Sequence, residues 1–566
     1  MKGTAGQLIY ETLRNYGVRC IFGMEDPIHL FHAVDPLATR IVTIHDERHA
    51  AVMAHGYAQV CGRPGVCAAT YGPGAANLSS GLYEAARSSV PVIALVQDHP
   101  VRLRGRHANS ELDHPAALAP YVKATLRVDQ ADRASDVIRR AFSLACSGRP
   151  GPVAVLCPTD VMGVVAEADV AADHRCATYP AVRPLANPED IARAAALLAA
   201  AERPLIVAGG GAMLSGAFEE VRRLAERFDA PVATTLTGRG ILPDDHPLAL
   251  GAIGNQTGGA LGRGRSANAV AAAADAVVVL GSKTGQLAYA DWTLFAPGVR
   301  LVHLDIDSHE IGRNFAAEVA LVGDVRDSLR ALLRHCEGAG LGRPRGDTAA
   351  RLAAMKAEWR TRNAPYVGSD AVPLRPERVI AAVNDVVDAD TVVVCDGSYA
   401  SGWVLSHIDI RAPRRTILSP RGTGSIGWGF AAAIGAKLGA PERPVICVTG
   451  DGGFYYGINE LETAARYRVP LLTVVLDNAT LGFQRHYEEQ AFGTYRECDF
   501  LHIDFAAVAR SLGAAGERAT QPGDLAPALA RGRAHAGPYV VDVVIDPEIA
   551  APVPGFERGI DLTLGH

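Results

Sequence analysis

Short apolar runs rich in valine, isoleucine and leucine alternate along the chain with longer runs rich in alanine and leucine. The short runs predict buried β-strands and the longer runs predict helices. Strands that alternate with helices favour parallel sheets covered by helices. The predicted strands are 20–23, 42–45, 65–70, 92–97, 153–157, 204–208, 232–235, 276–280, 299–306, 391–395, 445–449, 471–476 and 540–544.

These strands fall into three groups, which predict three domains at 1–165, 189–335 and 373–550. A chain of 566 residues is long enough for about three domains of ~100–200 residues each. The predicted fold class is therefore α/β, with three doubly wound parallel-sheet domains. The first and third groups have a similar period, which would fit an ancient duplication.

Composition excludes several classes of function. The net charge is −6, so no basic field indicates a nucleic-acid or anionic membrane partner. The chain has ten cysteines but no C-x-x-C pair, which is typical of a reduced, intracellular protein without a zinc or redox motif. It has no apolar signal segment and no uninterrupted apolar run of about 18 residues, so we expect a cytoplasmic protein that does not enter a membrane.

A glycine-rich run with one acid, 450–453, directly follows the predicted strand 445–449. Glycine lets the backbone approach phosphate oxygens and offer its N–H groups, so Gly452 and Gly453 are candidates for holding a phosphate. The carboxylate of Asp451 is a hard oxygen ligand suited to Mg²⁺. Taken alone, the run is also typical of an ordinary tight turn.

A second polar segment, 477–480, ends the next predicted strand. Adjacent parallel strands bring Asp451 and Asn478 to the same carboxyl edge, where open α/β sheets bind ligands. Their two oxygens, two phosphate oxygens, the carbonyl of Thr480 and a water would complete an octahedron around Mg²⁺. The alternative interpretation is that Asn478 only caps the strand end.

The span from Gly450 to Asn478 resembles the cofactor signature of thiamine diphosphate enzymes, which reads GDG, a long spacer and NN. Asp477 stands where the family has the first Asn, but the family's metal ligand is the second, retained here as Asn478. The resemblance implies thiamine diphosphate and Mg²⁺ as cofactors. It also implies that Leu481 and Gly482 contact the cofactor.

Two runs in the first segment, 43–49 and 70–78, resemble the pyrimidine-binding domain of the acetolactate synthase and 2-keto acid decarboxylase superfamily. The resemblance makes Glu47 the catalytic glutamate, which hydrogen-bonds N1′ of the aminopyrimidine, and places Pro73 and Asn77 at the cofactor. A carboxyl group with this task needs a mostly apolar cleft that raises its pKa. The structural alternative is an acid in the first turn of a helix, favoured by the helix dipole.

A third match is the glycine-rich run 422–430. In the resembling family, a bulky apolar residue here wedges between the two rings of the cofactor, and Ile426 occupies that place. The carbonyl of Gly424 would meet the 4′-amino group. Upstream, relatives contact the diphosphate at the positions of Gly397, Ser398 and Tyr399. Ile426 alone could equally be a core residue, but its glycine-rich flanks favour close backbone approach to a ligand.

The resemblance covers nearly the whole chain and implies an active site between the first domain of one subunit and the third domain of another. A homodimer is then the smallest active unit, usually extended to a homotetramer. The implied reaction is decarboxylation of a 2-oxo acid followed by carboligation to a second carbonyl acceptor. The alternatives are a non-ligating 2-keto acid decarboxylase, a 2-hydroxyacyl-CoA lyase or oxalyl-CoA decarboxylase-like enzyme, and a catalytically silent structural homologue.

The substrate residues are less well specified. Where acetolactate synthases have an Ala-Phe-Gln-Glu stretch, this chain has Asn109 and Ser110 in place of Phe and Gln, so we expect a more polar or roomier pocket. Gln484 and His486, which follow the metal motif, are predicted to pass near the substrate. Two acids in the loop 24–27 replace the family's usual Pro-Gly turn and would disfavour a nearby anionic group.

A glycine cluster, 208–211, follows a predicted strand in the second segment. A lone cluster of this kind is a weak sign of nucleotide binding, and no following acidic ribose-binding residue supports a Rossmann oxidoreductase. Relatives carry FAD or an adenine nucleotide in this domain. Because Lys283 stands where the flavin-contacting loop of the family has Arg, we favour an empty central domain over FAD.

Overall fold

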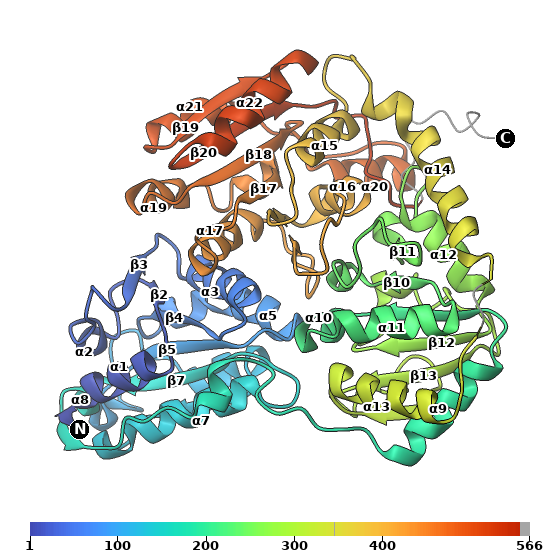
Figure 1. Ribbon diagram of the computed structural model, residues 1–566. Helices are drawn as coiled ribbons and strands as arrows, with labels where there is room; N and C mark the ends of the chain where they lie inside the picture. The colour runs from blue at the N-terminus through green and yellow to red at the C-terminus, as the bar shows by residue number, and fades with distance from the viewer. Residues whose placement is uncertain (344–345, 555–566) are drawn as a thin grey trace.

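A computed structural model describes residues 1–343 and 346–554 of the chain. It has three six-stranded sheets whose strands are all parallel, each covered by helices (Figure 1). The predicted α/β class with three doubly wound parallel sheets is therefore confirmed. The sheets lie in the first, second and third predicted segments, and the exact domain boundaries stay a prediction.

The first sheet has the strand order β3-β2-β4-β5-β7-β6. Its strands are β2 (Cys20–Gly23), β3 (Arg40–Thr43), β4 (Gly65–Ala69), β5 (Val92–Asp98), β6 (Thr125–Arg127) and β7 (Val153–Pro158). Its main helices are α1 (Ala5–Asn15), α3 (Glu47–Cys61), α5 (Ser79–Arg87) and α7 (Ala134–Cys146). A short antiparallel pair, β1 (Lys2–Thr4) with β8 (Val165–Glu167), joins the two ends of this domain.

The third sheet repeats the topology of the first, with the order β16-β15-β17-β18-β20-β19. Its strands are β15 (Val392–Cys395), β16 (Ile417–Leu418), β17 (Val445–Gly450), β18 (Leu471–Asp477), β19 (Ala515–Ala519) and β20 (Pro538–Val544). Its helices include α15 (Pro376–Asp385), α16 (Ser398–His407), α17 (Gly429–Gly439), α20 (Gly482–Phe492), α21 (Phe505–Ser511) and α22 (Pro522–Ala534). Numbered within each domain, both orders read 2-1-3-4-6-5.

The central sheet differs, with the order β11-β10-β9-β12-β13-β14, or 3-2-1-4-5-6 within its domain, as in dinucleotide-binding folds. Its strands are β9 (Pro204–Ala208), β10 (Val232–Thr234), β11 (Ala249–Ala252), β12 (Ala276–Leu280), β13 (Arg300–Asp305) and β14 (Val319–Val322). Its helices include α9 (Pro188–Ala200), α10 (Gly210–Ser215), α11 (Phe218–Phe228), α12 (Gly264–Ala273) and α13 (Val325–Gly338). The long helix α14 (Thr348–Val367) then leads to the third domain.

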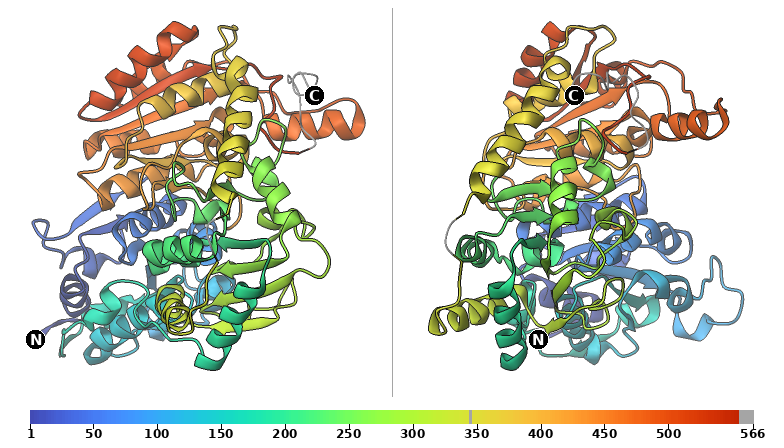
Figure 2. Two further views of the ribbon diagram at one scale, coloured as in Figure 1. Left: turned by 45° about the vertical axis from the view of Figure 1, so that its right-hand side comes forward. Right: turned by 90° about the vertical axis from the view of Figure 1, so that its right-hand side faces the viewer.

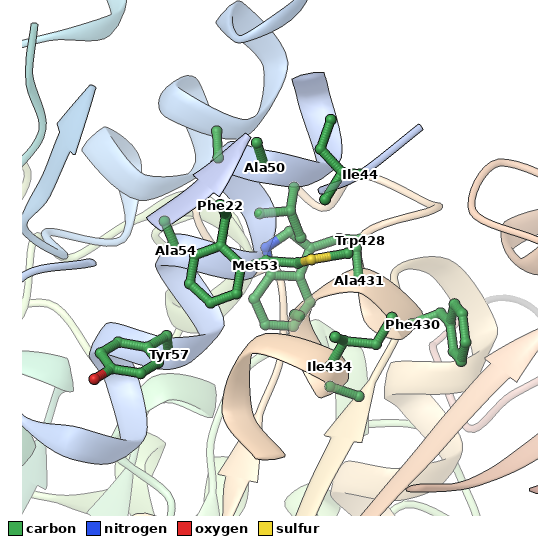
Figure 3. Close-up of a cluster of buried hydrophobic side chains, with 14 of the residues drawn as sticks. Phe22, Ile44, Ala50, Met53, Ala54, Tyr57, Trp428, Phe430, Ala431 and Ile434 are labelled. Carbon is green, nitrogen blue, oxygen red and sulfur yellow. The ribbon is translucent and has the colours of Figure 1, made fainter. Parts of the chain in front are cut away.

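Helices α3 and α17 pack against each other and join the first and third domains (Figures 1 and 3). Two glycines allow this close approach. A Cβ on Gly56 would lie 2.2 Å from the carbonyl oxygen of Ala432, and a Cβ on Gly435 would lie 2.0 Å from that of Met53. Apolar side chains around them, including Trp428 and Ile434, form one core shared by both domains (Figure 3).

Two further features bear on the predictions from composition. All ten cysteines are free thiols in the described structure, and nine of them are buried. Among the described residues, no helix combines the length and the apolar character that crossing a membrane would require.

Candidate functional site

A pocket opens at the carboxyl edge of the third sheet, between β15 and β17. The strand order reverses at this point, which is where open α/β sheets bind ligands. The pocket contains most of the residues predicted for this domain. It is lined by Asp396, Gly397, Ser398, Tyr399, Ala400, Trp403, Ile426, Gly450, Asp451, Gly452, Gly453, Leu476, Asn478, Thr480, Leu481, Gly482, Phe483, Ile545 and Ile549.

Three helices begin at this pocket: α16 after Gly397, α18 (Asp451–Phe454) after Gly450, and α20 after Leu481. The free N–H groups and positive dipole end of a helix N-terminus favour an anion. No lysine, arginine or histidine is among the described residues that line the pocket. An anion held here would therefore depend on backbone groups and on a bound cation for its neutralisation.

Three oxygen-bearing groups meet on one side of the pocket. The side-chain amide of Asn478 lies 3.3 Å from Asp451 Oδ1 and 2.9 Å from the carbonyl oxygen of Thr480. Two neighbouring ligands of an octahedral Mg²⁺ lie about 3.0 Å apart, because the metal–oxygen bonds are ~2.1 Å long. The spacing suits a shared cation if the amide oxygen faces inward. With the amide turned over, its nitrogen would donate to both oxygens instead.

The carboxylate of Asp451 also suits a cation. Its Oδ1 accepts a hydrogen bond from the N–H of Gly452 at 2.7 Å. Its Oδ2 is buried, and no group among the described residues hydrogen-bonds to it. Burial, together with the nearby charge of Asp477, raises the pKa of Asp451 to about 7. A cation beside such a carboxylate would stabilise its ionised form.

Asp396, at the end of β15, holds the glycine-rich loop in place. Its carboxylate accepts hydrogen bonds from the N–H groups of Gly427 and Trp428 at 2.9 and 3.0 Å, and also from Gly429. A Cβ on Gly453 would lie only 1.9 Å from Asp396 Oδ2. Asp396 directly follows the predicted strand 391–395, but nothing in the sequence revealed this positioning role.

The loop that Asp396 holds contains Gly424 and Ile426. Gly424 has φ +77° and Gly427 has φ +83°, a left-handed conformation that favours glycine. Ile426 lines the pocket, whereas Gly424 lines a neighbouring cavity between the domains, and the cofactor contacts of both residues stay predictions. Glu84 of the first domain supports the same loop by accepting hydrogen bonds from the N–H groups of Gly422 and Thr423 at 2.8 and 2.7 Å.

The residues predicted in the first domain form a second group at the carboxyl edge of the first sheet. Glu47 begins α3 and is only 8% exposed, and its Oε2 accepts a hydrogen bond from the amide of Asn77 at 3.0 Å. Pro73 is the first residue of α4 (Pro73–Asn77). Gly74 packs so closely that a Cβ there would lie 3.1 Å from Glu47 Oε1. The structure therefore brings Glu47, Pro73 and Asn77 together.

A single chain does not combine the two groups in one pocket. Among the described residues, those that line the pocket of the third sheet all belong to the third domain, and none comes from residues 1–165. Helix α20, whose first residues line that pocket, carries strongly exposed aromatic side chains, with Tyr487 50% and Phe492 73% exposed. This helix stands out from the body of the molecule (Figure 2).

The four predicted substrate residues lie outside that pocket. Asn109 and Ser110 are exposed on a loop beside the first-domain group, where Asn109 offers its carbonyl oxygen to the imidazole of His99 at 2.8 Å. Gln484 is exposed on α20 and donates to Glu488 at 2.7 Å. His486 is buried and lies 3.0 Å from the hydroxyl of Tyr399 and 3.0 Å from the carbonyl oxygen of Pro547. It therefore contacts the pocket through Tyr399.

A larger cavity of about 560 Å³ lies where the three domains meet. It reaches the switch point of the central sheet, where Gly211 packs against Gly281. Lys283 lines it and donates a hydrogen bond to the carbonyl oxygen of Arg87. Burial, together with the charges of Arg149 and Arg87, lowers the pKa of Lys283 to about 7.

Comparison with known proteins gives a consistent result along the chain. Three family models match it: the thiamine pyrophosphate enzyme N-terminal TPP binding domain over residues 3–117, the central domain over 191–332 and the C-terminal TPP binding domain over 396–543. A probable acetolactate synthase large subunit of Methanocaldococcus jannaschii is 34% identical over 98% of this chain and 93% of its own length. An acetolactate synthase of Mycobacterium bovis is 33% identical over 100% and 94%, and one of Arthrospira platensis is 31% identical over 95% and 94%.

Proposed function

The chain belongs to the thiamine pyrophosphate enzyme family, and from that membership we propose that it is an acetolactate synthase-like carboligase that requires Mg²⁺. In this proposal it decarboxylates a 2-oxo acid and joins the remaining fragment to a second carbonyl compound. The three relatives, which match over 93–94% of their own length, are named acetolactate synthases, and this favours carboligation over simple decarboxylation.

The chemistry of the third-domain pocket is the observation on which the metal proposal rests. A diphosphate bound there would meet helix N-termini but no basic side chain among the described residues. A divalent cation would neutralise it, and Asp451, Asn478 and the carbonyl of Thr480 are the oxygen ligands that Mg²⁺ prefers. The buried Oδ2 of Asp451, which has no hydrogen-bond partner among the described residues, fits a metal ligand.

The cofactor, when bound, supplies a carbon nucleophile and an electron sink for breaking the bond next to a carbonyl. The chain's own residues supply binding and proton control. Gly397, Ser398, Tyr399, Gly452 and Gly453 would hold the diphosphate, together with Leu481 and Gly482. Ile426 would support the cofactor between its rings, with the carbonyl of Gly424 facing the 4′-amino group. Glu47, held by Asn77, would exchange a proton with N1′ of the pyrimidine.

We propose that the active unit is at least a homodimer. In one chain the Glu47 group and the diphosphate pocket are separate, so a second copy would have to present its first domain to the pocket. The exposed aromatic residues of α20 beside the pocket are suited to such an interface. A homotetramer would pair two of these dimers.

The polar residues Asn109 and Ser110 favour an acceptor or donor with more polar groups than pyruvate carries. Gln484 and His486 are proposed to act from the chain that contributes the diphosphate pocket, His486 through its contact with Tyr399. A non-ligating 2-keto acid decarboxylase, and an enzyme acting on acyl-CoA thioesters, are the reactions that a failure of carboligation would favour.

Mass analysis of products tests the proposal. The protein is incubated with thiamine diphosphate, Mg²⁺ and a panel of 2-oxo acids, with and without aldehyde or 2-oxo acid acceptors. We expect a coupled product together with CO₂. Aldehyde alone would indicate a decarboxylase, and no turnover of any acid by cofactor-loaded protein would direct the search to acyl-CoA or diketone substrates.

The central cavity calls for a separate measurement, because relatives in this family differ in what the central domain holds. We propose that activity does not depend on FAD, since the Arg of the flavin-contacting loop is replaced by Lys283. The visible absorbance of the purified protein, and of the supernatant after denaturation, tests this directly. A stoichiometric flavin spectrum would overturn it.

A further inference from the structure

A buried carboxylate at the end of β5 gathers hydrogen bonds from several directions. Asp98 is 3% exposed. Its Oδ1 accepts from the N–H of His99 at 2.9 Å and from Nδ1 of His114 at 3.0 Å. Its Oδ2 accepts from Arg104 and Arg127, each at 3.0 Å. Burial opposes ionisation, but the hydrogen bond from His114 and the arginine charges outweigh it and lower the pKa of Asp98.

The contacts of His114 fix where its ring carries a proton. Its Nε2 lies 3.0 Å from the backbone nitrogen of Gly72, which can only donate. Nε2 must therefore be the acceptor, and the proton is on Nδ1, facing Asp98. His114 is fully buried. Asp98, His114 and the N–H of Gly72 thus form a continuous hydrogen-bonded chain inside the first domain.

Gly72, whose N–H donates to His114, lies in a turn with an unusual backbone conformation. Gly72 has φ +63° and ψ −112° and precedes Pro73, the first residue of α4. A Cβ on Gly72 would lie 2.4 Å from the carbonyl oxygen of Ser110, so the substrate loop rests directly on this turn. Without His114, the buried N–H of Gly72 would lose its hydrogen-bond partner, which favours opening of the turn.

The same turn leads to the groups that surround Glu47. Helix α4 ends at Asn77, whose amide donates to Glu47 Oε2 at 3.0 Å. Gly74 packs on Glu47 Oε1. On the other side, Asp98 holds Arg104 of the loop that carries Asn109 and Ser110. Asp98 is therefore connected both to the segment that supports Glu47 and to the predicted substrate loop.

We propose that Asp98 and His114 are positioning residues that hold the turn at Gly72. The fixed turn keeps Asn77 and Glu47 in one arrangement toward the cofactor. It also keeps the loop of Asn109 and Ser110 packed against the turn. The proposal rests on the proposed function for the role of Glu47. The hydrogen bonds that link Asp98, His114 and Gly72, called the clamp below, do not depend on that function. Neither residue touches the reacting atoms in this proposal, since they act through the backbone of residues 70–77.

Two amide substitutions at position 114 separate the two halves of the clamp. In His114→Gln the amide oxygen can take the place of Nε2 and accept from Gly72, while the link to Asp98 is weakened. In His114→Asn the amide nitrogen can take the place of Nδ1 and donate to Asp98, but the side chain is too short to reach Gly72. Both variants replace imidazole by a buried amide, so they are matched for loss of the ring.

Hydrogen exchange of the cofactor-free protein and calorimetric titration with thiamine diphosphate in Mg²⁺ measure the outcome. We expect His114→Asn to exchange amides of residues 70–78 about tenfold faster than wild type and to bind the cofactor about tenfold more weakly. His114→Gln should restore both values to within about threefold of wild type. The melting temperatures of the two variants should be similar.

Equal exchange and equal affinity in the two variants would overturn the proposal, as would wild-type values in His114→Asn. Failure of the proposed function is a different result, because it would appear in the wild-type protein, which would then form no coupled product or bind no thiamine diphosphate. The exchange measurement uses no cofactor, so it still decides whether His114 clamps the Gly72 turn in that case.

Discussion

The first and third domains share one topology but carry different functional groups on the corresponding loops. The loop after the second strand carries Glu47 in the first domain and Ile426 in the third. The loop after the third strand carries the Gly72 turn in one and Asp451 in the other. The fourth strand ends at Asp98 in the first domain and is followed by Asn478 in the third. The shared topology thus determines where functional groups lie, while the side chains determine what they bind.

The difference follows from the charge of what each edge would hold. The third-domain edge has three helix N-termini and converging oxygens, which suit a diphosphate with its metal ion. The first-domain edge has a carboxylate held by an amide, which suits an uncharged ring with a basic nitrogen. Two sheets of the same topology can therefore supply both halves of a cofactor site if two copies of the chain face each other.

The largest expected effect tests the first-domain edge. Glu47→Gln should keep thiamine diphosphate bound but slow deuterium exchange at C2 of the cofactor by about 10²–10⁴-fold, because the amide cannot exchange the proton. Exchange followed by NMR, with affinity measured by calorimetry, checks this. The control is Asp46→Asn, which retains a good N-cap for α3 and should stay within a few-fold of wild type. Wild-type exchange in Glu47→Gln would remove Glu47 from its role.

The next effect tests the third-domain edge. Asp451→Asn removes the anionic ligand without changing shape, so Mg²⁺ should bind at least about 100-fold more weakly in the presence of cofactor. Asp477→Asn is the matched control, since Asp477 bonds Arg518 and the N–H of Ala479 rather than the proposed metal. Calorimetric titration with Mg²⁺ measures both. Equal losses in the two variants would show that local charge, not ligation by Asp451, holds the metal.

The sequence predicted the interior of each sheet better than its edges. The interior strands β2, β4, β5, β9, β12, β17 and β18 have nearly continuous apolar runs because helices cover both faces of each sheet. Five of the six edge strands, β6, β11, β14, β16 and β19, were not predicted. Most are short or only partly buried, like β14 with its alternating exposure, so their sequences carry a weak apolar signal.

In the candidate site, residues that lie in sequence motifs were predicted, whereas residues that meet only through the tertiary fold were not. Asp451, Asn478 and Glu47 follow strands in recognisable motifs, and the third-domain residues do line one pocket. Asp98 and His114 are 16 residues apart with no motif between them. Their pairing depends on how a loop folds back on β5, and the same holds for Asp396 and the glycine-rich loop. Residues that act through tertiary contacts leave no spacing signal in one sequence.

Substitutions at two glycines of the run 450–453 should separate an effect on stability from an effect on cofactor binding. A Cβ on Gly453 would meet the buried carboxylate of Asp396, so Gly453→Ala should lower the free energy of unfolding by about 3 kcal/mol. A Cβ on Gly450 meets nothing within 4 Å but would enter the pocket, so Gly450→Ala should stay stable and bind cofactor weakly. Denaturant unfolding and cofactor titration measure the two effects, and a stable Gly453→Ala would contradict the role given to Asp396.

The smallest effect tests the symmetry of the two domains at the helix pair they share. Gly56 of α3 and Gly435 of α17 each allow the other helix's backbone to approach, at 2.2 and 2.0 Å from the position of a Cβ. Alanine at either site would push the helices apart at a cost of about 1–3 kcal/mol, partly offset by about 1 kcal/mol of gained helix propensity. We therefore expect Gly56→Ala and Gly435→Ala each to lower the free energy of unfolding by at most about 2 kcal/mol in denaturant unfolding. Because both glycines relieve the same contact, the double variant should lose less than the sum of the two single losses. Additive losses would mean that the helices accommodate each methyl group independently. The close packing of α3 against α17 would then not act as one contact.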